Sequence, residues 1–225
     1  GVRNAISANT QGLVAVAEVD SVDIGKLSGL LDNDSGQPKY TSHAKCPTSY
    51  PVLHMQFNPA NPSFLAIAGA RHCEVVTVGR NGTVQDRLHV ELGLEGVGDA
   101  AMILRVLWVP GSQVRLAVVT NQFVKVYDLS SDAISPQHFL TLIEDSIRDA
   151  TFVKKGSRVK LLTVGSSGMM YIQEISSDPG DGGPCIMITT VPLDAAVVGK
   201  TAASVHYSPQ MDLVFASFAD TKCFA

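Results

Sequence analysis

The sequence predicts an all-β fold of repeated antiparallel sheets, and three observations lead to this prediction. The first is the stretch 102–129, where three short runs rich in Val, Leu, Ile and aromatic residues are separated by Pro110-Gly111-Ser112 and by Asn121. Apolar runs of this length, broken by residues that suit tight turns, are typical of strands joined by hairpins. This stretch is therefore expected to be an antiparallel meander.

The second observation is that both sides of the first of these runs are apolar. One side carries Met102, Leu104, Val106 and Trp108, and the other carries Ile103, Leu107 and Val109, with Arg105 as the exception. An antiparallel sheet with one wet face would alternate apolar and polar residues, so this sheet is expected to be covered on both faces.

The third observation is that the unit repeats along the chain. An aromatic residue closes the first strand of each unit, with spacings of 51, 44 and 55 residues between Phe57, Trp108, Phe152 and Tyr207. Periods of about 40 to 50 residues with about four strands each are typical of β-propellers of the WD40 or kelch kind. We therefore predict a partial WD40-like β-propeller of about four to five four-stranded antiparallel blades, incomplete at both ends.

Residues 1–50 are predicted to hold the end of a preceding blade and a polar loop. Two strands are expected within 11–31, where LVAVAEV and VDIGKLSGLL flank an Asp-Ser turn. The start of this blade is either disguised in residues 1–10 or absent. Residues 32–50 are rich in Asp, Ser, Gly and Pro and are expected to form a loop.

Further blades are predicted after this loop, all within one propeller domain. Complete blades are assigned to 51–100, 101–145 and 146–200, and the start of a truncated blade to 201–225. Their outer strands are expected around Thr83 to Leu92, Gln137 to Ile143 and Cys185 to Val191. Asn81-Gly82 is interpreted as the tight turn that leads into the first of these outer strands.

Composition excludes several classes of protein. With 225 residues, 45% of them hydrophobic and 17% charged, the chain can bury a sizeable core. The net charge is −4, whereas nucleic-acid-binding proteins carry an excess of Lys and Arg on one face, so no nucleic acid partner is expected. The apolar runs are all far shorter than the roughly 18 residues that a membrane span requires, so no membrane span is expected.

The cysteines and the first residue indicate the cellular compartment of the protein and whether the chain is part of a longer one. The four cysteines, Cys46, Cys73, Cys185 and Cys223, include no closely spaced pair, so we interpret them as structural thiols in a reducing compartment. The chain opens on Gly1 and not on Met, which favours an internal piece of a longer protein.

Several motifs closely resemble the propeller region of the giant E3 ubiquitin ligases of the N-degron pathway. That family includes calossin, or pushover, in animals and the auxin transport protein BIG in plants. The resemblance is most specific over 102–136, where VLWVPGSQVRLAVVTNQFVKVYDLSSDAISP runs almost without a gap. It continues over about 51–225 through VLHMQFNPANPSFLAIAG, SIRDATFV and SVHYSPQMDLVFASF, and it is thin over 1–50.

The resemblance implies a non-catalytic propeller segment that serves as scaffold and docking module in a giant cytosolic E3 ubiquitin ligase. The family's zinc-binding degron box and ligase module need clusters of Cys and His that this sequence lacks, so zinc and ligase activity are implied for the parent alone. Implied partners are the remainder of the ligase chain and, elsewhere on it, calmodulin and a RING-type partner ligase. The implied localisation is cytoplasmic and also nuclear.

A search for catalytic motifs assigns no catalytic, cofactor-binding or metal-binding residue. Gly165-Ser166-Ser167-Gly168 lacks the spacing of a nucleophile elbow, and Ser42-His43-Ala44-Lys45 lacks the companion motifs of Ser-x-x-Lys enzymes. The stretch 93–98 does not fit a phosphate-binding loop, and the six histidines show no i, i+4 pair.

One candidate docking site and one structural motif remain. Four positive charges stand on a predicted hairpin tip, at Lys154, Lys155, Arg158 and Lys160. They are either solvated or dock an acidic partner segment. Tyr127-Asp128 stands where WD repeats carry Trp-Asp and is interpreted as packing and turn support. These two residues and the four repeated aromatic residues are the expected structural anchors.

Three functions stay open from the sequence. The leading one is the scaffold and docking segment of a giant ligase, the second is a stand-alone WD40-like interaction adaptor, and the third is a propeller hydrolase or lyase. A native polypeptide thousands of residues long would favour the first over the second. Turnover by the purified domain would favour the third.

Overall fold

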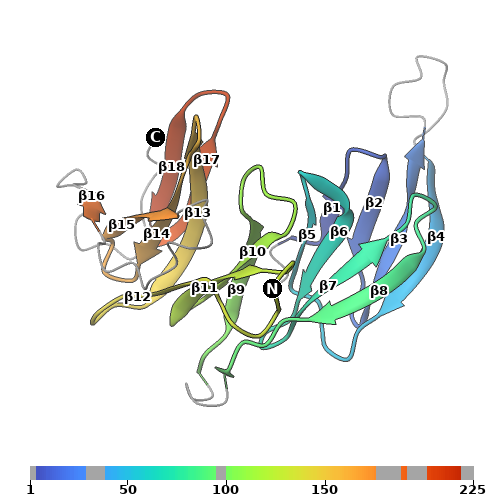
Figure 1. The fold of residues 1–225 in the computed structure, drawn as a ribbon, viewed down its shortest axis with the longest axis horizontal. Helices are drawn as coiled ribbons and strands as arrows, with labels where there is room; N and C mark the ends of the chain where they lie inside the picture. Colours follow the sequence, from blue (N-terminus) through green and yellow to red (C-terminus); the bar gives the residue numbers. More distant parts are fainter. Residues whose placement is uncertain (1–3, 29–38, 95–99, 176–188, 192–201, 219–225) are drawn as a thin grey trace. The chain divides into compact units, whose positions relative to one another are not determined.

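The computed structural model describes residues 4–28, 39–94, 100–175, 189–191 and 202–218, which form an all-β fold (Figure 1). Within these residues, eighteen strands lie in five antiparallel sheets. Strands that follow one another in sequence are hydrogen-bonded neighbours in every sheet, so each sheet is a meander. The predicted four-stranded antiparallel unit is confirmed for four of the five sheets.

The chain divides into two compact units, and the first comprises residues 1–92 with 111–114. Its first sheet contains β1 (Ile6–Ala8), β2 (Leu13–Ala17), β3 (Ser21–Ser28) and β4 (Lys39–Pro47). Its second sheet contains β5 (His54–Asn58), β6 (Asn61–Ala68), β7 (Cys73–Val78) and β8 (Val84–His89). The first strands of the two sheets, β1 and β5, contact each other.

The second unit comprises residues 93–110 with 115–225. One sheet contains β9 (Ile103–Trp108), β10 (Arg115–Thr120), β11 (Phe123–Asp128) and β12 (His138–Thr141). The next contains β13 (Ile147–Lys155), β14 (Arg158–Gly165), β15 (Met170–Ile175) and β16 (Thr189–Val191). The last contains β17 (Ala202–Ser208) and β18 (Leu213–Phe218), and β13 contacts both β9 and β17.

Each unit buries its core between neighbouring sheets, which explains the apolar faces on both sides of the strands. In the first unit, Leu13 and Ile24 pack with Met55 and Leu65 of the next sheet. In the second unit, one cluster joins the sheet of β9 to that of β13, and another joins the sheet of β13 to that of β17. Inner strands with two buried faces have little room for polar residues, so the strand runs are nearly continuous hydrophobic stretches.

The structure corrects the prediction for residues 32–50. Lys39–Pro47 is not a loop but β4, which pairs with β3 over its whole length. The start of this blade lies at Ile6–Ala8, inside the stretch whose content was left open. β4 is the outermost strand of its sheet, so most of its side chains face solvent and its composition is that of a loop. Residues 29–38 lie outside the described part.

Other predicted elements occur where they were expected. β8, β12 and β16 lie inside the three ranges predicted for outer strands. At the Asn81-Gly82 turn, Gly82 has a φ of +83° and Asn81 Oδ1 accepts a hydrogen bond from Thr83 N. Cys46 and Cys73 are buried free thiols, while Cys185 and Cys223 lie outside the described residues. The blade boundaries and the assignment of all blades to one domain stay predictions.

Candidate functional site

The structural anchors lie in the core. The four repeated aromatic residues are between 3% and 8% exposed on the first strands of their sheets: Phe57, Trp108, Phe152 and Tyr207. Tyr127 on β11 is fully buried. The neighbouring Asp128 carboxylate accepts hydrogen bonds from Ser130 N and Oγ and from Gln137 Nε2, which hold the turn after β11.

The four basic residues predicted to dock a partner lie at the tip of the β13–β14 hairpin. Across the two strands, Lys155 faces Arg158, and Lys154 faces Val159. Since side chains alternate along a strand, Lys155, Arg158 and Lys160 share one face of the hairpin and Lys154 lies on the other. Three of the charges therefore lie on one face of the hairpin and the fourth lies on the other face.

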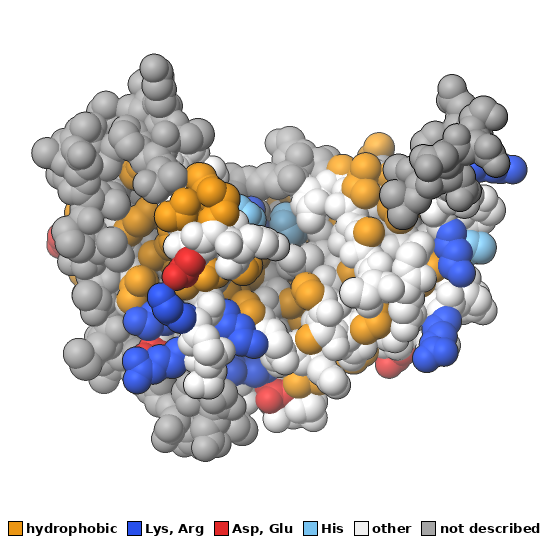
Figure 2. Space-filling model, turned by 90° about the horizontal axis from the view of Figure 1, so that it is seen from above, with side chains coloured by type: hydrophobic (Ala, Val, Ile, Leu, Met, Phe, Trp, Pro, Cys, Tyr) orange, Lys and Arg blue, Asp and Glu red, His pale blue; other side chains and the backbone are white. Residues whose placement is uncertain are grey.

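Two of these four charges have acidic neighbours. Lys155 Nζ lies 3.0 Å from Asp212 Oδ2 in the β17–β18 turn, and Arg158 Nε lies 3.9 Å from Glu174 Oε1 on β15. Hydrogen bonds from Lys155 and from Tyr207 OH lower the pKa of Asp212. Figure 2 shows Lys and Arg side chains gathered in the left part of the view, with an acidic side chain beside them. All four pair members are largely exposed, so these ion pairs add little stability.

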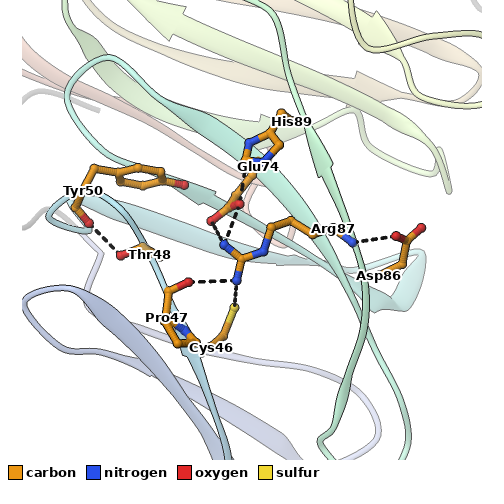
Figure 3. A network of polar contacts seen from close by, with 8 residues as sticks. All are labelled: Cys46, Pro47, Thr48, Tyr50, Glu74, Asp86, Arg87 and His89. Atoms are coloured by element: carbon orange, nitrogen blue, oxygen red, sulfur yellow. Dashed lines mark hydrogen bonds and ion pairs between the residues drawn. The ribbon is translucent and has the colours of Figure 1, made fainter.

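An ionic network around the buried Glu74 carboxylate in the first unit joins its two sheets (Figure 3). Glu74 on β7 is fully buried, and its two carboxylate oxygens accept hydrogen bonds of 3.1 and 3.3 Å from Arg87 Nη1 on β8. Arg87 Nη2 donates to the Pro47 carbonyl at 2.8 Å and to Cys46 Sγ at 3.1 Å, both on β4. One guanidinium thus connects the outer strands of two neighbouring sheets.

The pKa values of two groups in and beside this network are raised. Burial raises the pKa of the Cys46 thiol, although Arg87 opposes that shift. Burial and the nearby Glu74 carboxylate also raise the pKa of Tyr50, whose ring stacks on His72 with centroids 5.1 Å apart. Both groups stay protonated at neutral pH, so neither offers the anion that nucleophilic chemistry needs.

A second buried carboxylate, Asp149 on β13, links three strands of the second unit. Its Oδ2 accepts a 3.0 Å hydrogen bond from Val205 N on β17, and its Oδ1 accepts one from Ala150 N. Arg105 Nη1 on β9 lies 3.4 Å from Oδ1 and donates to the Ala150 carbonyl. Asp149 is 1% exposed, so these contacts are shielded from water. The first strands of three successive sheets are therefore joined through one side chain.

A third carboxylate, Asp145, holds the turn that contains the rejected nucleophile motif. It accepts hydrogen bonds from Ser166 Oγ at 2.6 Å, from Ser167 N and Oγ, and from Tyr171 OH at 3.1 Å. Burial acts to raise the pKa of Asp145, but the hydrogen bonds from Ser166, Ser167 and Tyr171 outweigh it and lower the pKa. A Cβ at Gly165 would overlap the Asp145 carboxylate, so a larger residue here would displace Asp145 from these hydrogen bonds.

The described residues contain no group of three or more His, Cys, Asp or Glu side chains placed to hold a metal ion. They also contain no helix long and apolar enough to cross a membrane.

Sequence reasoning missed the carboxylate that links the inner strands, although a signal for it exists. Counting three residues back from each repeated aromatic residue gives a polar side chain in an otherwise apolar strand: His54, Arg105, Asp149 and Ser204. Two of these, Arg105 and Asp149, pair across neighbouring sheets. A polar residue at a fixed offset inside a buried strand needs a partner, and that requirement is the missed signal.

No family model matches this chain, but individual proteins do. It is 40% identical over 228 residues to a probable E3 ubiquitin-protein ligase of Dictyostelium discoideum, an alignment that covers 99% of this chain. It is 36% identical to Auxin transport protein BIG of Oryza sativa subsp. japonica over 97% of the chain, and 30% identical to Protein purity of essence of Drosophila pseudoobscura pseudoobscura over 95%. The chain spans about 4% of the length of each of these relatives.

Solved structures identify the fold. The β-propeller domain of Cps50 (Swd1) from Myceliophteria thermophila matches with a TM-score of 0.67 at 14% identity, over 96% of this chain and 66% of that one. Sqt1 from Chaetomium thermophilum matches with a TM-score of 0.63 at 14% identity, over 94% of this chain and 52% of that one. The fold is therefore that of a β-propeller, as the strand repeat predicted.

Proposed function

Because this chain is a homologue of one segment of the BIG-family proteins, we propose that it is a non-catalytic β-propeller segment of a giant E3 ubiquitin ligase. Its role in this proposal is to act as structural scaffold and as a surface on which other proteins dock. The observation that carries the proposal is the alignment with the Dictyostelium ligase, which covers 99% of this chain and 4% of that protein.

The use of the buried ionisable groups supports a scaffold role. Glu74 and Asp149 are at most 1% exposed. Glu74 pairs with Arg87, which donates to the Pro47 carbonyl of the neighbouring sheet, and Asp149 accepts a hydrogen bond from Val205 of the neighbouring sheet. Asp145 holds a turn against the strand that follows it. A catalytic acid or base must instead reach a substrate, which the enclosed Glu74 and Asp149 do not do.

The wider setting belongs to the same proposal and follows from the resemblance. In it, the parent is a ligase of the N-degron pathway that acts in the cytoplasm and also in the nucleus. Zinc, calmodulin and a RING-type partner ligase bind elsewhere on that polypeptide. Within this segment, the basic hairpin of residues 154–160 docks an acidic partner segment.

The test uses the full-length parent with its four hairpin charges neutralised, as K154Q, K155Q, R158Q and K160Q together. We expect this variant to retain less of at least one co-purifying protein, measured by quantitative mass spectrometry, since charge complementarity is lost. We expect its rate of ubiquitin discharge from a loaded ubiquitin-conjugating enzyme to stay at the wild-type level. R148Q is the matched control, because Arg148 is an exposed basic residue at the other end of β13.

Two results would contradict the proposal. Unchanged retention of every partner would remove the docking role of the hairpin. Slower discharge in the H43A or H206A variant, with the partner set intact, would show that this segment takes part in chemistry. Both histidines are exposed and form no part of the packing described above.

A further inference from the structure

Gln173 on β15 carries a buried amide that has no hydrogen-bond partner among the described residues. Its side chain is 2% exposed, and neither Nε2 nor Oε1 forms a hydrogen bond there. A carboxamide offers two donor hydrogens and an oxygen that accepts two hydrogen bonds. Buried polar side chains in folded proteins nearly always have a partner, which is either a protein group or an ordered water molecule. The Gln173 amide therefore needs a partner other than the described protein groups.

A second buried polar group of this kind lies on the neighbouring strand. Thr163 on β14 is 1% exposed, and its Oγ1 has no hydrogen-bond partner within the described ranges. Thr163 pairs with Tyr171 across the two strands, and Gln173 follows Tyr171 by two residues. Residues two apart share one face of a strand, so Thr163 and Gln173 are diagonal neighbours on the same face. The Cβ atoms of such neighbours are about 7 Å apart.

This face of β14 and β15 is covered by the sheet that contains β9 to β12. Leu161 lies two residues before Thr163, and Ile175 lies two residues after Gln173. Leu161 and Ile175 both belong to the core cluster that joins the two sheets, and Val126 on β11 belongs to the same cluster. The hydroxyl and the amide therefore lie in the layer between two sheets of the second unit.

The facing sheet contributes a third polar atom to this layer. His138 on β12 is 6% exposed, pairs with Val126 and lies two residues before Leu140, and both of these residues belong to the same cluster. Its Nδ1 has no hydrogen-bond partner in the described part of the chain. Burial and the nearby Arg115 lower the pKa of His138, so its ring is neutral at neutral pH. All three of these polar groups are therefore uncharged.

A hydroxyl and a carboxamide at this place fit a small neutral molecule that both donates and accepts hydrogen bonds. Neither group carries a charge, so the pair would not offset the cost of burying an ion. An apolar ligand would leave the donors and acceptors of both groups unpaired. Water is the smallest molecule that offers both kinds of hydrogen bond, and a buried water typically makes about three.

We propose that Thr163 and Gln173 hold an ordered water molecule in the layer between these two sheets. In this arrangement the water connects Thr163 Oγ1 to the Gln173 amide, across a gap that is typical of water-mediated contacts. His138 Nδ1 is the polar atom that the facing sheet contributes to the same layer. The water pairs polar groups that the apolar side chains around them cannot pair.

The direct test is a density map of the full-length parent protein at a resolution that shows ordered water. We expect a peak within hydrogen-bonding distance of both Thr163 Oγ1 and the Gln173 amide. A map that shows other buried waters but no peak at this position would overturn the inference. Density for a side chain of the parent protein at this position would overturn it as well.

A pair of substitutions tests the same site through stability. T163V and Q173M replace the hydroxyl and the amide with apolar groups of nearly the same shape, and hydrogen exchange of peptides from β14 and β15 is measured in the full-length protein. Each single variant leaves the water and the other group with one partner fewer, so exchange should become about tenfold faster. With both groups replaced, no partner is needed, and exchange should return to within about threefold of the wild-type rate.

The matched control is T141V with Q122M, since Thr141 and Gln122 are exposed residues of the neighbouring sheet and of its β10–β11 turn. These variants should leave exchange unchanged, singly and together. Additive effects in the T163V/Q173M double variant, slower exchange in Q173M alone, or unchanged exchange in both single variants would each overturn the inference. Partner retention and ubiquitin discharge are not part of these readouts, so such a failure would leave the proposed function standing.

Discussion

At the scale of single residues, Trp108 is a side chain whose loss should strongly destabilise the fold. It is 5% exposed on β9, a strand with two covered faces. Replacing a buried tryptophan with alanine leaves a large cavity, so W108A should lower the free energy of unfolding by about 3–5 kcal/mol. Denaturant unfolding measures the loss. M102A is the control and should change stability by about 0.5 kcal/mol or less, because Met102 is 47% exposed; an equal loss in both variants would contradict the core assignment.

Asp145 should make the free energy of unfolding depend on pH. Its pKa is lowered in the folded protein, so its stabilising contribution is complete above the unfolded-state pKa of about 3.9 and is lost as the pH falls through the lower folded value. Unfolding experiments in urea between about pH 5 and pH 2 should therefore show a steeper loss of stability for the wild type than for D145N. Parallel curves for the two proteins would mean that the carboxylate contributes nothing in its charged form.

Sequence patterns predict individual residues well where burial alone decides their role. The aromatic residues at the ends of the first strands are conspicuous because their spacing repeats, and all four are buried. The roles of Arg105 and Asp149 could not be found in this way. A charged residue inside an apolar strand is explained only by its partner, and Val205 lies 56 residues further along the chain.

At the scale of strands, Asp149 makes β9, β13 and β17 depend on one another. In D149A, the amide of Val205 loses its acceptor and Arg105 loses its counter-charge inside the protein. Removing one partner of a buried ion pair costs about 3–5 kcal/mol. Hydrogen exchange should therefore show lower opening free energies for amides of all three strands.

The control for this prediction is D86A. Asp86 is an exposed aspartate on β8 that accepts a hydrogen bond only from the next residue's amide among the contacts described. Its removal should leave protection in both units nearly unchanged. Loss of protection confined to β13 in D149A would show that the carboxylate supports its own strand and does not couple three.

The position of a strand within its sheet also determines whether the strand can be predicted from the sequence. Inner strands such as β10 are buried on both faces, so their composition is unmistakable. Outer strands face solvent, and β4 carries the composition of a loop although it pairs with β3 throughout. The loop prediction for 39–47 was wrong because apolar composition indicates only whether a strand is buried. An exposed edge strand has a polar composition and is held in the sheet by its backbone hydrogen bonds.

At the scale of the whole molecule, a repeated local pattern was enough to predict the β-propeller class. The repeat arises because strands that are neighbours in sequence also pair in the sheet. Such local contacts produce a regular pattern of apolar runs and turns in the sequence. The candidate docking site is a different matter. Four charges within seven residues suggest one surface, yet strand alternation divides them and ion pairs engage two of them. The pairing of strands determines which of the charged side chains share one face of the hairpin and are available to a partner.

The bond from Val205 N to Asp149 Oδ2 also orders events during synthesis. A ribosome adds about 5–20 residues per second, so the 56 residues that separate the two groups take roughly 3 to 11 s to appear. During that interval Asp149 Oδ2 lacks the hydrogen bond from Val205 N, while Oδ1 can already accept one from Ala150 N. The bond between β13 and β17 can therefore form only after this interval, when Val205 has been synthesised.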